Sequence, residues 1–340
     1  GEVRRVTGET NARLVSHQPQ SRTTMTTDRI DLEFASAPGG AELRKALANG
    51  RSAVESQPMA GSPPPPARVL RSEVIEMSMR DGGAEIDSVS THAAGEIEFV
   101  PSHPSQRHRR MTGERMWIQY GPRNAIRTFR AVGVDTTTGP ATPKGAPART
   151  SSKNLLAHFH AESGEMTRLE QWDDFRYAEG DRKATASRAE LDSAANRITL
   201  DTAARVWDPA GSTSADKILI EQSSGDYIAE GRVTSSRAPE KKSGLLPGDD
   251  PVQAVAPRMT TTRGHALIRY EGGAVLWQGG NRIRAATIDI DREERRLIAS
   301  GNVETQLVDR RTKARTVTTA AGLIYTESDR QAHYSGGVVM

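Results

Sequence analysis

The chain contains no cysteine among its 340 residues. This absence excludes disulfide bonds, thiolate metal sites and a cysteine nucleophile. No stretch approaches the ~18 uncharged apolar residues of a membrane-spanning helix, so the sequence predicts no such span. No catalytic or nucleotide-binding motif occurs in a fitting context either, so we expect neither an enzyme nor a bound cofactor.

Apolar residues are also scarce: 35% of the chain is hydrophobic and 4% is aromatic. One large close-packed core is therefore not expected, and a thin, elongated structure or partial disorder fits the composition better. Charge is abundant but balanced, with 46 Lys and Arg against 43 Asp and Glu and a net charge of +3. Because the two signs are interleaved and form no basic tail, the composition argues against a nucleic-acid partner.

Segments rich in Pro, Gly and Ser at 61–66, 138–152 and 237–258 are typical of linkers and loop insertions. We therefore expect an N-terminal β module over 1–137, a linker at 138–152, and a C-terminal β module over 153–340. The 61–66 linker falls in the first module and the insertion at 237–258 in the second. The chain begins without a leader, so we expect a fragment or mature form, with an export signal upstream and a truncation at 340.

Short runs of period-two alternation dominate between these segments, which predicts an all-β fold with little helix. The runs form an internal repeat. Copies at 215–233, 285–303 and 320–338 each end in Gly-x-Val, and an apolar residue stands eleven positions before each of these glycines. The copy at 188–204 has Thr202 in place of the Gly, and the copy at 265–283 has a shorter turn.

Weaker copies occupy 30–54, 72–100, 115–134 and 153–177, for about nine two-strand units in all. Each unit is interpreted as a strand, a polar turn, a second strand, and then a Gly at a bulge or sharp bend. Alternation puts apolar side chains on one face and mostly polar ones on the other, as expected for half-buried antiparallel strands.

These units resemble the OstA-like repeat of the LptA-type lipopolysaccharide-transport proteins. The family pattern is an Ala-Asp or Ala-Ala start, an alternating strand, a polar turn, a second strand and Gly-Asn-Val. It is clearest here at 288–291 (IDID), followed by 301–303 (GNV). The resemblance is specific over 184–340 and extends to 28–180. It implies an elongated, bent β-jelly-roll with an open apolar interior, in the periplasm of a Gram-negative-type bacterium.

The same resemblance implies a carrier or bridge component that binds the lipid A part of lipopolysaccharide and helps move it to the outer membrane. The lipid-binding inner face is predicted to comprise Ile198, Leu200, Ile218, Ile220, Tyr227, Ile268, Tyr270, Val275, Trp277, Ile288, Ile290, Leu297, Val303, Leu323, Tyr325, Tyr334 and Val338. The implied partners are lipopolysaccharide and other β-jelly-roll transport components, including a second copy, joined by edge-strand pairing. The chain is longer than a single family module, so it either fuses two modules or resembles the inner-membrane-tethered or outer-membrane components.

Two alternatives stay open: a structural or adhesive β-repeat protein with a packed interior, and a polysaccharide-binding β-solenoid. A groove lined by aliphatic residues favours lipid, whereas an exposed ladder of aromatic and acidic residues would favour sugar. The aromatic residues on the apolar face serve equally as core packing or as lipid contacts, because the inner face of a single-walled jelly roll is both core and groove.

Three polar clusters carry weaker signals. His158 and His160 share a strand face, but with no carboxylate apparent nearby they are interpreted as surface histidines rather than a metal pair. The basic run at 103–110 (HPSQRHRR) could meet phosphate head groups, although a solvated loop is favoured. Asp173 and Asp174, near Glu170, would point to opposite faces of a strand, which argues against a cation site. We predict no metal site.

Overall fold

The computed structural model describes residues 3–18, 21–58, 66–162, 164–239, 250–309 and 311–340. In these residues the chain is almost entirely β-strand, and the one helical element is the three-residue 3-10 turn Pro122–Asn124. The all-β fold class expected from the period-two pattern is confirmed. The chain divides into two compact units, Gly1–Gly180 (unit 1) and Asp181–Met340 (unit 2).

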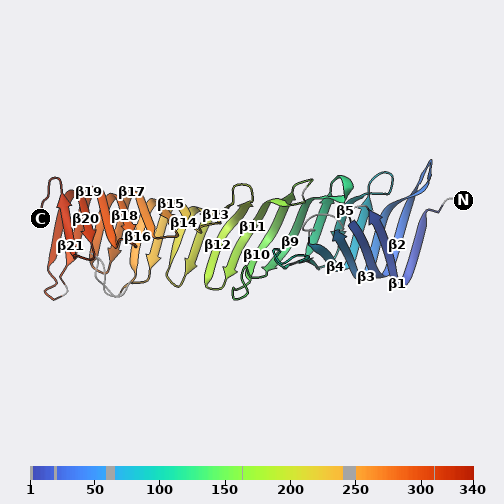
Figure 1. The fold of residues 1–340 in the computed structure, drawn as a ribbon, viewed down its shortest axis with the longest axis horizontal. Helices are drawn as coiled ribbons and strands as arrows, with labels where there is room; N and C mark the ends of the chain where they lie inside the picture. Colours follow the sequence, from blue (N-terminus) through green and yellow to red (C-terminus); the bar gives the residue numbers. More distant parts are fainter. Residues whose placement is uncertain (1–2, 19–20, 59–65, 163, 240–249, 310) are drawn as a thin grey trace. The chain divides into compact units, whose positions relative to one another are not determined.

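Unit 2 is a regular antiparallel meander in which each strand pairs with the next along the chain (Figure 1). Its strands are β12 (Arg182–Asp192), β13 (Arg197–Asp208), β14 (Gly211–Glu221), β15 (Tyr227–Arg237), β16 (Val252–Thr262), β17 (Leu267–Gln278), β18 (Asn281–Asp291), β19 (Arg296–Val308), β20 (Arg315–Thr326) and β21 (Gln331–Ser335). Most are long enough to carry one half-strand on each side of a mid-length bend.

Unit 1 is the same kind of meander with an irregular middle (Figure 1). Its strands are β1 (Arg5–Gln18), β2 (Ser21–Ala37), β3 (Gly40–Pro58), β4 (Ala67–Met79), β5 (Ile86–Thr91), β6 (Gly95–Val100), β7 (Arg109–Gly113), β8 (Arg115–Tyr120), β9 (Ile126–Thr138), β10 (Ala148–Phe159) and β11 (Met166–Glu179). β4 pairs with both β5 and β6, and β9 pairs with both β7 and β8. Each short pair is therefore equivalent to one long strand interrupted at mid-length.

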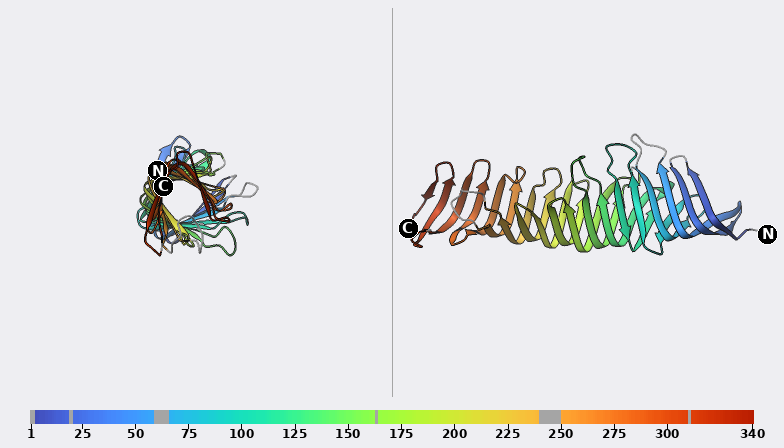
Figure 2. Two further views of the ribbon diagram at one scale, coloured as in Figure 1. Left: turned by 90° about the vertical axis from the view of Figure 1, so that its left-hand side faces the viewer. Right: turned by 90° about the horizontal axis from the view of Figure 1, so that it is seen from below.

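The strands bend at mid-length (Figure 2), and the repeated glycine lies at this bend. Two consecutive residues adopt the left-handed conformation there: Gly301 (φ 77°) and Asn302 (φ 50°) in β19, and Gly231 (φ 75°) and Arg232 (φ 46°) in β15. The ladder register shifts at the same points. A Cβ on Gly301 would lie 2.8 Å from the Cβ of Ala286, so the corner requires glycine both for its backbone and for its space. The glycine thus lies at a corner inside one continuous strand, not after the end of a strand.

The corner of β13 is made without glycine. Thr202 (φ 63°) and Ala203 (φ 54°) occupy the two left-handed positions, where the sequence comparison puts Thr202 in place of the Gly. A β-branched residue is strained in this conformation. Both residues are exposed, so their side chains meet no neighbouring wall.

The corners divide the strands of each unit into two walls that face each other. In unit 2, the aliphatic wall is defined by the inward residues Ile218, Met259, Ile268, Tyr270, Ile288 and Leu323. The hydroxyl wall is defined by the inward residues Thr213, Ser235, Thr305 and Thr318. Buried alanines stand beside the corners, namely Ala215, Ala229, Ala285 and Ala299. Their small side chains allow the two walls to converge there.

In unit 1 the same two walls follow from the strand register. The half-strands that carry Thr23, Ser56 and Arg68 are neighbours and form the hydroxyl wall of unit 1. The half-strands that carry Val89 and Ile118 form the facing aliphatic wall. Buried residues of both walls belong to one hydrophobic cluster, so the walls pack against each other.

The boundary of the compact units does not coincide with the module boundary expected at 138–152. β9 and β10 pair directly up to Thr138 and Ala148, so within that stretch only 139–147 forms a loop, and both strands belong to unit 1. Of the insertion expected at 237–258, residues 252–258 belong to β16, while 240–249 lie outside the described residues. The linker at 61–66 also lies outside them, except for Pro66.

Candidate functional site

Unit 2 contains every residue predicted for the lipid-binding face, and fourteen of the seventeen face its interior. Nine are buried: Leu200, Ile218, Ile268, Tyr270, Ile288, Leu297, Val303, Leu323 and Tyr325. Five are half-buried and share the inward face of their strands by alternation: Ile198, Ile220, Tyr227, Ile290 and Tyr334. The structure therefore brings these residues together between the two walls, and their contact with lipid stays a prediction.

Three predicted residues lie elsewhere. In β17 the buried residues after the corner are Ala274, Leu276 and Gln278, so Val275 and Trp277 alternate onto the outer face. The corner residues are Gly272 and Gly273, so the position after the corner, occupied by Val303 in β19, is occupied by Ala274 here. The repeat comparison interprets the segment around Gly272 and Gly273 as the shortened polar turn of this copy, whereas it is the corner inside the single strand β17. With the corner taken for a turn, the residues after it are assigned to the wrong faces. Val338 follows β21 and is 49% exposed.

Tyrosines bridge the two walls of unit 2. The hydroxyl of Tyr270 on the aliphatic wall lies 2.8 Å from Ser235 Oγ on the hydroxyl wall. The hydroxyl of Tyr227 lies 2.8 Å from Thr213 Oγ1, and the hydroxyl of Tyr334 lies 2.8 Å from Thr305 Oγ1. Burial raises the pKa of Tyr270 and of Tyr227, so both hydroxyls stay protonated at neutral pH. These hydrogen bonds hold the interior of unit 2 closed.

Unit 1 has a different interior near the strand ends. A cavity of about 40 Å³ lies between its two walls, lined by Thr23, Ser56 and Arg68 from the hydroxyl wall and by Ile86, Ile118 and Tyr120 from the facing wall, among others. The Nε of Arg68 is buried and has no hydrogen-bond partner in the described part of the chain. Sequence reasoning did not single out Arg68. Its signal is its position two residues before Leu70, which puts a cation on the inward, apolar alternation of β4.

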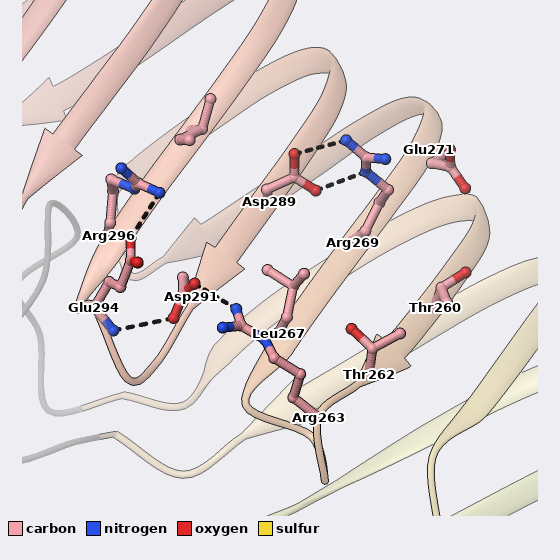
Figure 3. Close-up of a pocket in the computed structure, with 11 residues that line it drawn as sticks. Thr260, Thr262, Arg263, Leu267, Arg269, Glu271, Asp289, Asp291, Glu294 and Arg296 are labelled. Carbon is pink, nitrogen blue, oxygen red and sulfur yellow. Dashed lines mark hydrogen bonds and ion pairs between the residues drawn. The ribbon is translucent and has the colours of Figure 1, made fainter. Parts of the chain in front are cut away.

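A second, larger depression of about 590 Å³ lies on the outer face of β16–β19 (Figure 3). Cross-strand ion pairs line it: Arg269 Nε lies 2.7 Å from Asp289 Oδ1, and Arg263 Nη2 lies 2.5 Å from Asp291 Oδ2. A backbone N–H bond from Glu294 and the Arg263 guanidinium hold the pKa of Asp291 below its usual range. Because these opposite charges neutralise one another, this face is a solvated ion-pair ladder that stabilises the sheet.

The weaker polar clusters have structural roles. Asp173 and Asp174 are the left-handed corner residues of β11, and Asn154 donates a hydrogen bond to Asp173. The basic run at 103–110 is a loop up to His108, and Arg109 and Arg110 begin β7. His108 pairs with Glu98, and Arg110 pairs with Glu96 on the neighbouring strand. Among the described residues, no group of three or more His, Asp or Glu could hold a metal ion.

No helix in the described ranges has both the length and the apolar character needed to cross a membrane. A comparison with curated proteins yields no match. Residues 104–226 match the family model described as LptA/(LptD N-terminal domain) LPS transport protein. The match covers part of each compact unit and lies mostly outside residues 184–340, where the repeats are most regular. Over residues 104–226, the resemblance to the LptA-type lipopolysaccharide-transport family is therefore confirmed.

Proposed function

We propose that the protein is a non-enzymatic lipid carrier of the lipopolysaccharide-transport type, which holds acyl chains of lipid A between the two walls. The observation that carries the proposal is the continuous inward row of large apolar side chains in unit 2, in a chain that matches an LPS-transport family model. The row extends from Leu200 in β13 to Tyr325 in β20. A continuous row suits a long, flexible alkyl chain better than a compact ligand.

The energetics favour such a carrier. Each buried methylene contributes ~0.8 kcal/mol, so a dozen-carbon chain that leaves a membrane for water costs roughly 10 kcal/mol. Breaking three cross-wall tyrosine hydrogen bonds costs about 0.5–1.5 kcal/mol each. The apolar surface that the walls expose on separating is covered again by the acyl chain. Entry of one acyl chain therefore outweighs the cost of opening the interior.

The same family match supports the proposed location and partners. A carrier of this type works in the periplasm and passes lipid to other β-jelly-roll components. Such components would dock by strand addition to a free sheet edge. Within the described residues β21 pairs only with β20, and its outer edge is the candidate docking edge of unit 2.

Photo-cross-linking in Gram-negative cells tests the proposal. A photoreactive phenylalanine analogue replaces either Tyr227, on the inner face, or Trp277, on the outer face; both native side chains are aromatic and half-buried, which matches the two variants. We expect a lipopolysaccharide adduct at position 227 and none at position 277. A host strain whose lipopolysaccharide lacks O-polysaccharide ensures that the adduct reports on lipid A and core.

The rival hypothesis is a structural β-repeat protein with a packed interior. The close packing of the interior of unit 2 supports this rival, since Ile218, Ile268 and Ile288 are each 0% exposed. The rival predicts no adduct at position 227 or equal adducts at both positions, and either result contradicts the carrier proposal.

A further inference from the structure

Arg68 is an anomaly in the interior of unit 1. It stands on β4 in alternation with the buried Leu70 and Ser72, and its strand neighbours at the same level are Ser56 and Phe99. No carboxylate of the described residues pairs with it, whereas Arg71 and Arg110 on the outer face are ion-paired. Burial lowers the pKa of the Arg68 guanidinium, which indicates that the surroundings disfavour its charge.

The group opposite Arg68 is Tyr120, the last residue of β8 on the facing wall. The two side chains are close enough to interact electrostatically, and burial raises the pKa of Tyr120, which keeps it a neutral hydrogen-bond donor. The hydroxyls of Ser21, Thr23 and Ser56 line the same cavity. The donors of both walls thus converge on one space that contains no acid.

The size and place of the cavity suit the head of an amphiphile. The cavity has a volume of about 40 Å³. A single water needs about 10–15 Å³ in the same measure, so the cavity has room for a group larger than one water. Ser21 begins β2, Ile86 begins β5 and Tyr120 ends β8, so the cavity lies at the strand ends, away from the corner. Val54, Leu70 and Ile97 line its apolar side.

Arg68 is half-buried, and its Nε is buried without a partner among the described residues. A cation so placed loses part of its hydration, and proteins normally pair it or let it coordinate an anion. We infer that the cavity between β4 and β8 in unit 1 binds the anionic head of an amphiphile, a phosphate monoester or an equivalent oxyanion. Arg68 donates a forked pair of hydrogen bonds to two of its oxygens, and the Tyr120 hydroxyl donates to a third. The alkyl chain extends along Val54, Leu70 and Ile97.

This inference deepens the proposed function and rests on it for the biological source of the amphiphile, since lipid A carries phosphates at its polar end. The binding chemistry itself is independent of transport. Arg68 would fix the orientation of the lipid, head at the strand ends and chain toward the corner. In unit 2, the hydroxyls of Thr213 and Ser235 on the corresponding wall are already bonded to tyrosines.

Calorimetric titration of the whole chain tests the inference with three probes: monododecyl phosphate below its micelle concentration, the neutral dodecyl maltoside, and inorganic phosphate. The variants are Arg68→Gln, Arg68→Lys, and the matched control Arg127→Gln, an exposed arginine on the outer face of β9. We expect monododecyl phosphate to bind the parent and Arg127→Gln alike, and Arg68→Gln about tenfold more weakly or worse. Arg68→Lys should keep part of the affinity, because it retains charge but not the fork.

Stability supplies a second readout. Without ligand, Arg68→Gln should unfold at the same or a higher temperature than the parent, because it removes a half-buried charge that has no partner in the described ranges. Monododecyl phosphate should raise the unfolding temperature of the parent but not of this variant. A variant that unfolds much earlier without ligand would show Arg68 to be a structural residue and would overturn the inference.

The remaining titration results each either support or overturn the anion site. If inorganic phosphate binds as tightly as monododecyl phosphate, the anion site stands with a free oxyanion as its ligand; if only the amphiphile binds, the site stands as a lipid head-group site. Equal binding of monododecyl phosphate by the parent and Arg68→Gln, or tighter binding of dodecyl maltoside by the parent, overturns it. A failed adduct at position 227 together with Arg68-dependent binding would reject the transport proposal and retain the anion site.

Discussion

Units 1 and 2 share a backbone plan and differ in what fills it. In both, strands turn a left-handed corner and form two facing walls: Gly50 and Arg51 make the corner of β3 as Gly231 and Arg232 make that of β15. The interior of unit 2 is bridged by tyrosine bonds such as Tyr270 to Ser235. The interior of unit 1 instead has a cavity with an unpartnered arginine.

This difference separates two kinds of information in a repeat. The corner is a backbone requirement, met by glycine wherever a Cβ would collide with the neighbouring strand. The inward side chains differ from strand to strand, because the backbone does not fix their chemical identity. Two units of one fold can therefore differ in what their interiors offer a ligand.

The largest expected effect tests what the units share. Gly301→Val in unit 2 and Gly50→Val in unit 1 each put a β-branched residue at positive φ, where a Cβ would lie 2.8 Å from Ala286 Cβ or 2.7 Å from Asp28 Oδ2. Each should lower the free energy of unfolding by about 2–4 kcal/mol. Chemical denaturation, monitored by hydrogen exchange of the backbone amides, should show the loss of stability in the substituted unit only.

The control for the corner is Thr202→Gly, which relieves strain at the one corner of unit 2 that starts with a β-branched residue. It should stabilise by about 1 kcal/mol or less, because glycine also gains freedom in the unfolded chain. If Gly301→Val were neutral, or Thr202→Gly destabilising, the left-handed corner would not be a requirement of the fold.

The next effect tests how the interiors differ. Tyr270→Phe leaves the buried Ser235 hydroxyl without its partner and should cost about 1–3 kcal/mol. Tyr120→Phe in unit 1 removes a hydroxyl that faces the cavity and should cost less than ~1 kcal/mol. Urea denaturation of both variants measures the contrast. Equal losses would mean that the walls of unit 1 are bridged as those of unit 2 are.

A pH effect should distinguish the units as well. Burial lowers the pKa of His265 in unit 2, so the folded state stays neutral where the unfolded chain binds a proton. This stability is complete above about pH 6.5, the ordinary pKa, and is lost as pH falls through that value toward the lower pKa of the folded state. His265→Asn tolerates the left-handed backbone at this position and should flatten the dependence between pH 7.5 and 5.

The acidic groups set a second window. Burial would raise the pKa of Asp226, but backbone N–H bonds from His265 and Gly264 outweigh burial and lower it. In unit 1, hydrogen bonds from Arg29 and Thr7 lower the pKa of Asp31. Both contributions are present above about pH 4 and are lost below it. Thermal unfolding from pH 8 to 3 should thus show unit 2 weakening earlier; simultaneous weakening would contradict the role of His265.

The smallest effect concerns the edge of unit 2. Val339 exchanges backbone hydrogen bonds with Thr319 (3.0 and 2.8 Å), so by antiparallel alternation the N–H of Val338 points away from β20. Val338→Pro removes that edge donor and should weaken self-association by about tenfold or less, while Val338→Ala retains it. Sedimentation velocity at several concentrations measures both. Equal association of the two variants would exclude docking through this edge.

Much of the fold could be predicted from local patterns. Period-two alternation predicts the strands, and the Gly-x-Val repeats predict bends, because both are properties of a few consecutive residues. The face of each strand could be predicted wherever the corner was aligned correctly, as for Ile288 and Tyr325. It could not at Val275 and Trp277, because the adjacent glycines at 272 and 273 have the pattern of a turn between two strands although they form the corner inside one, and a change of phase reverses the faces.

The sequence by itself determined the all-β fold, the corners and most of the inward residues, because hydrophobic period and glycine sterics act over a few neighbouring positions. The tertiary structure alone decided which residues meet across the interior. Ser235 and Tyr270 are 35 positions apart and meet only after the corner folds one wall onto the other. From the sequence, Arg68 is an ordinary strand residue. Only the folded structure puts it opposite a wall whose described residues offer no acid at this point, so that its Nε is buried without a partner among them. Burial and charge pairing are properties of both walls together, and no single strand specifies them.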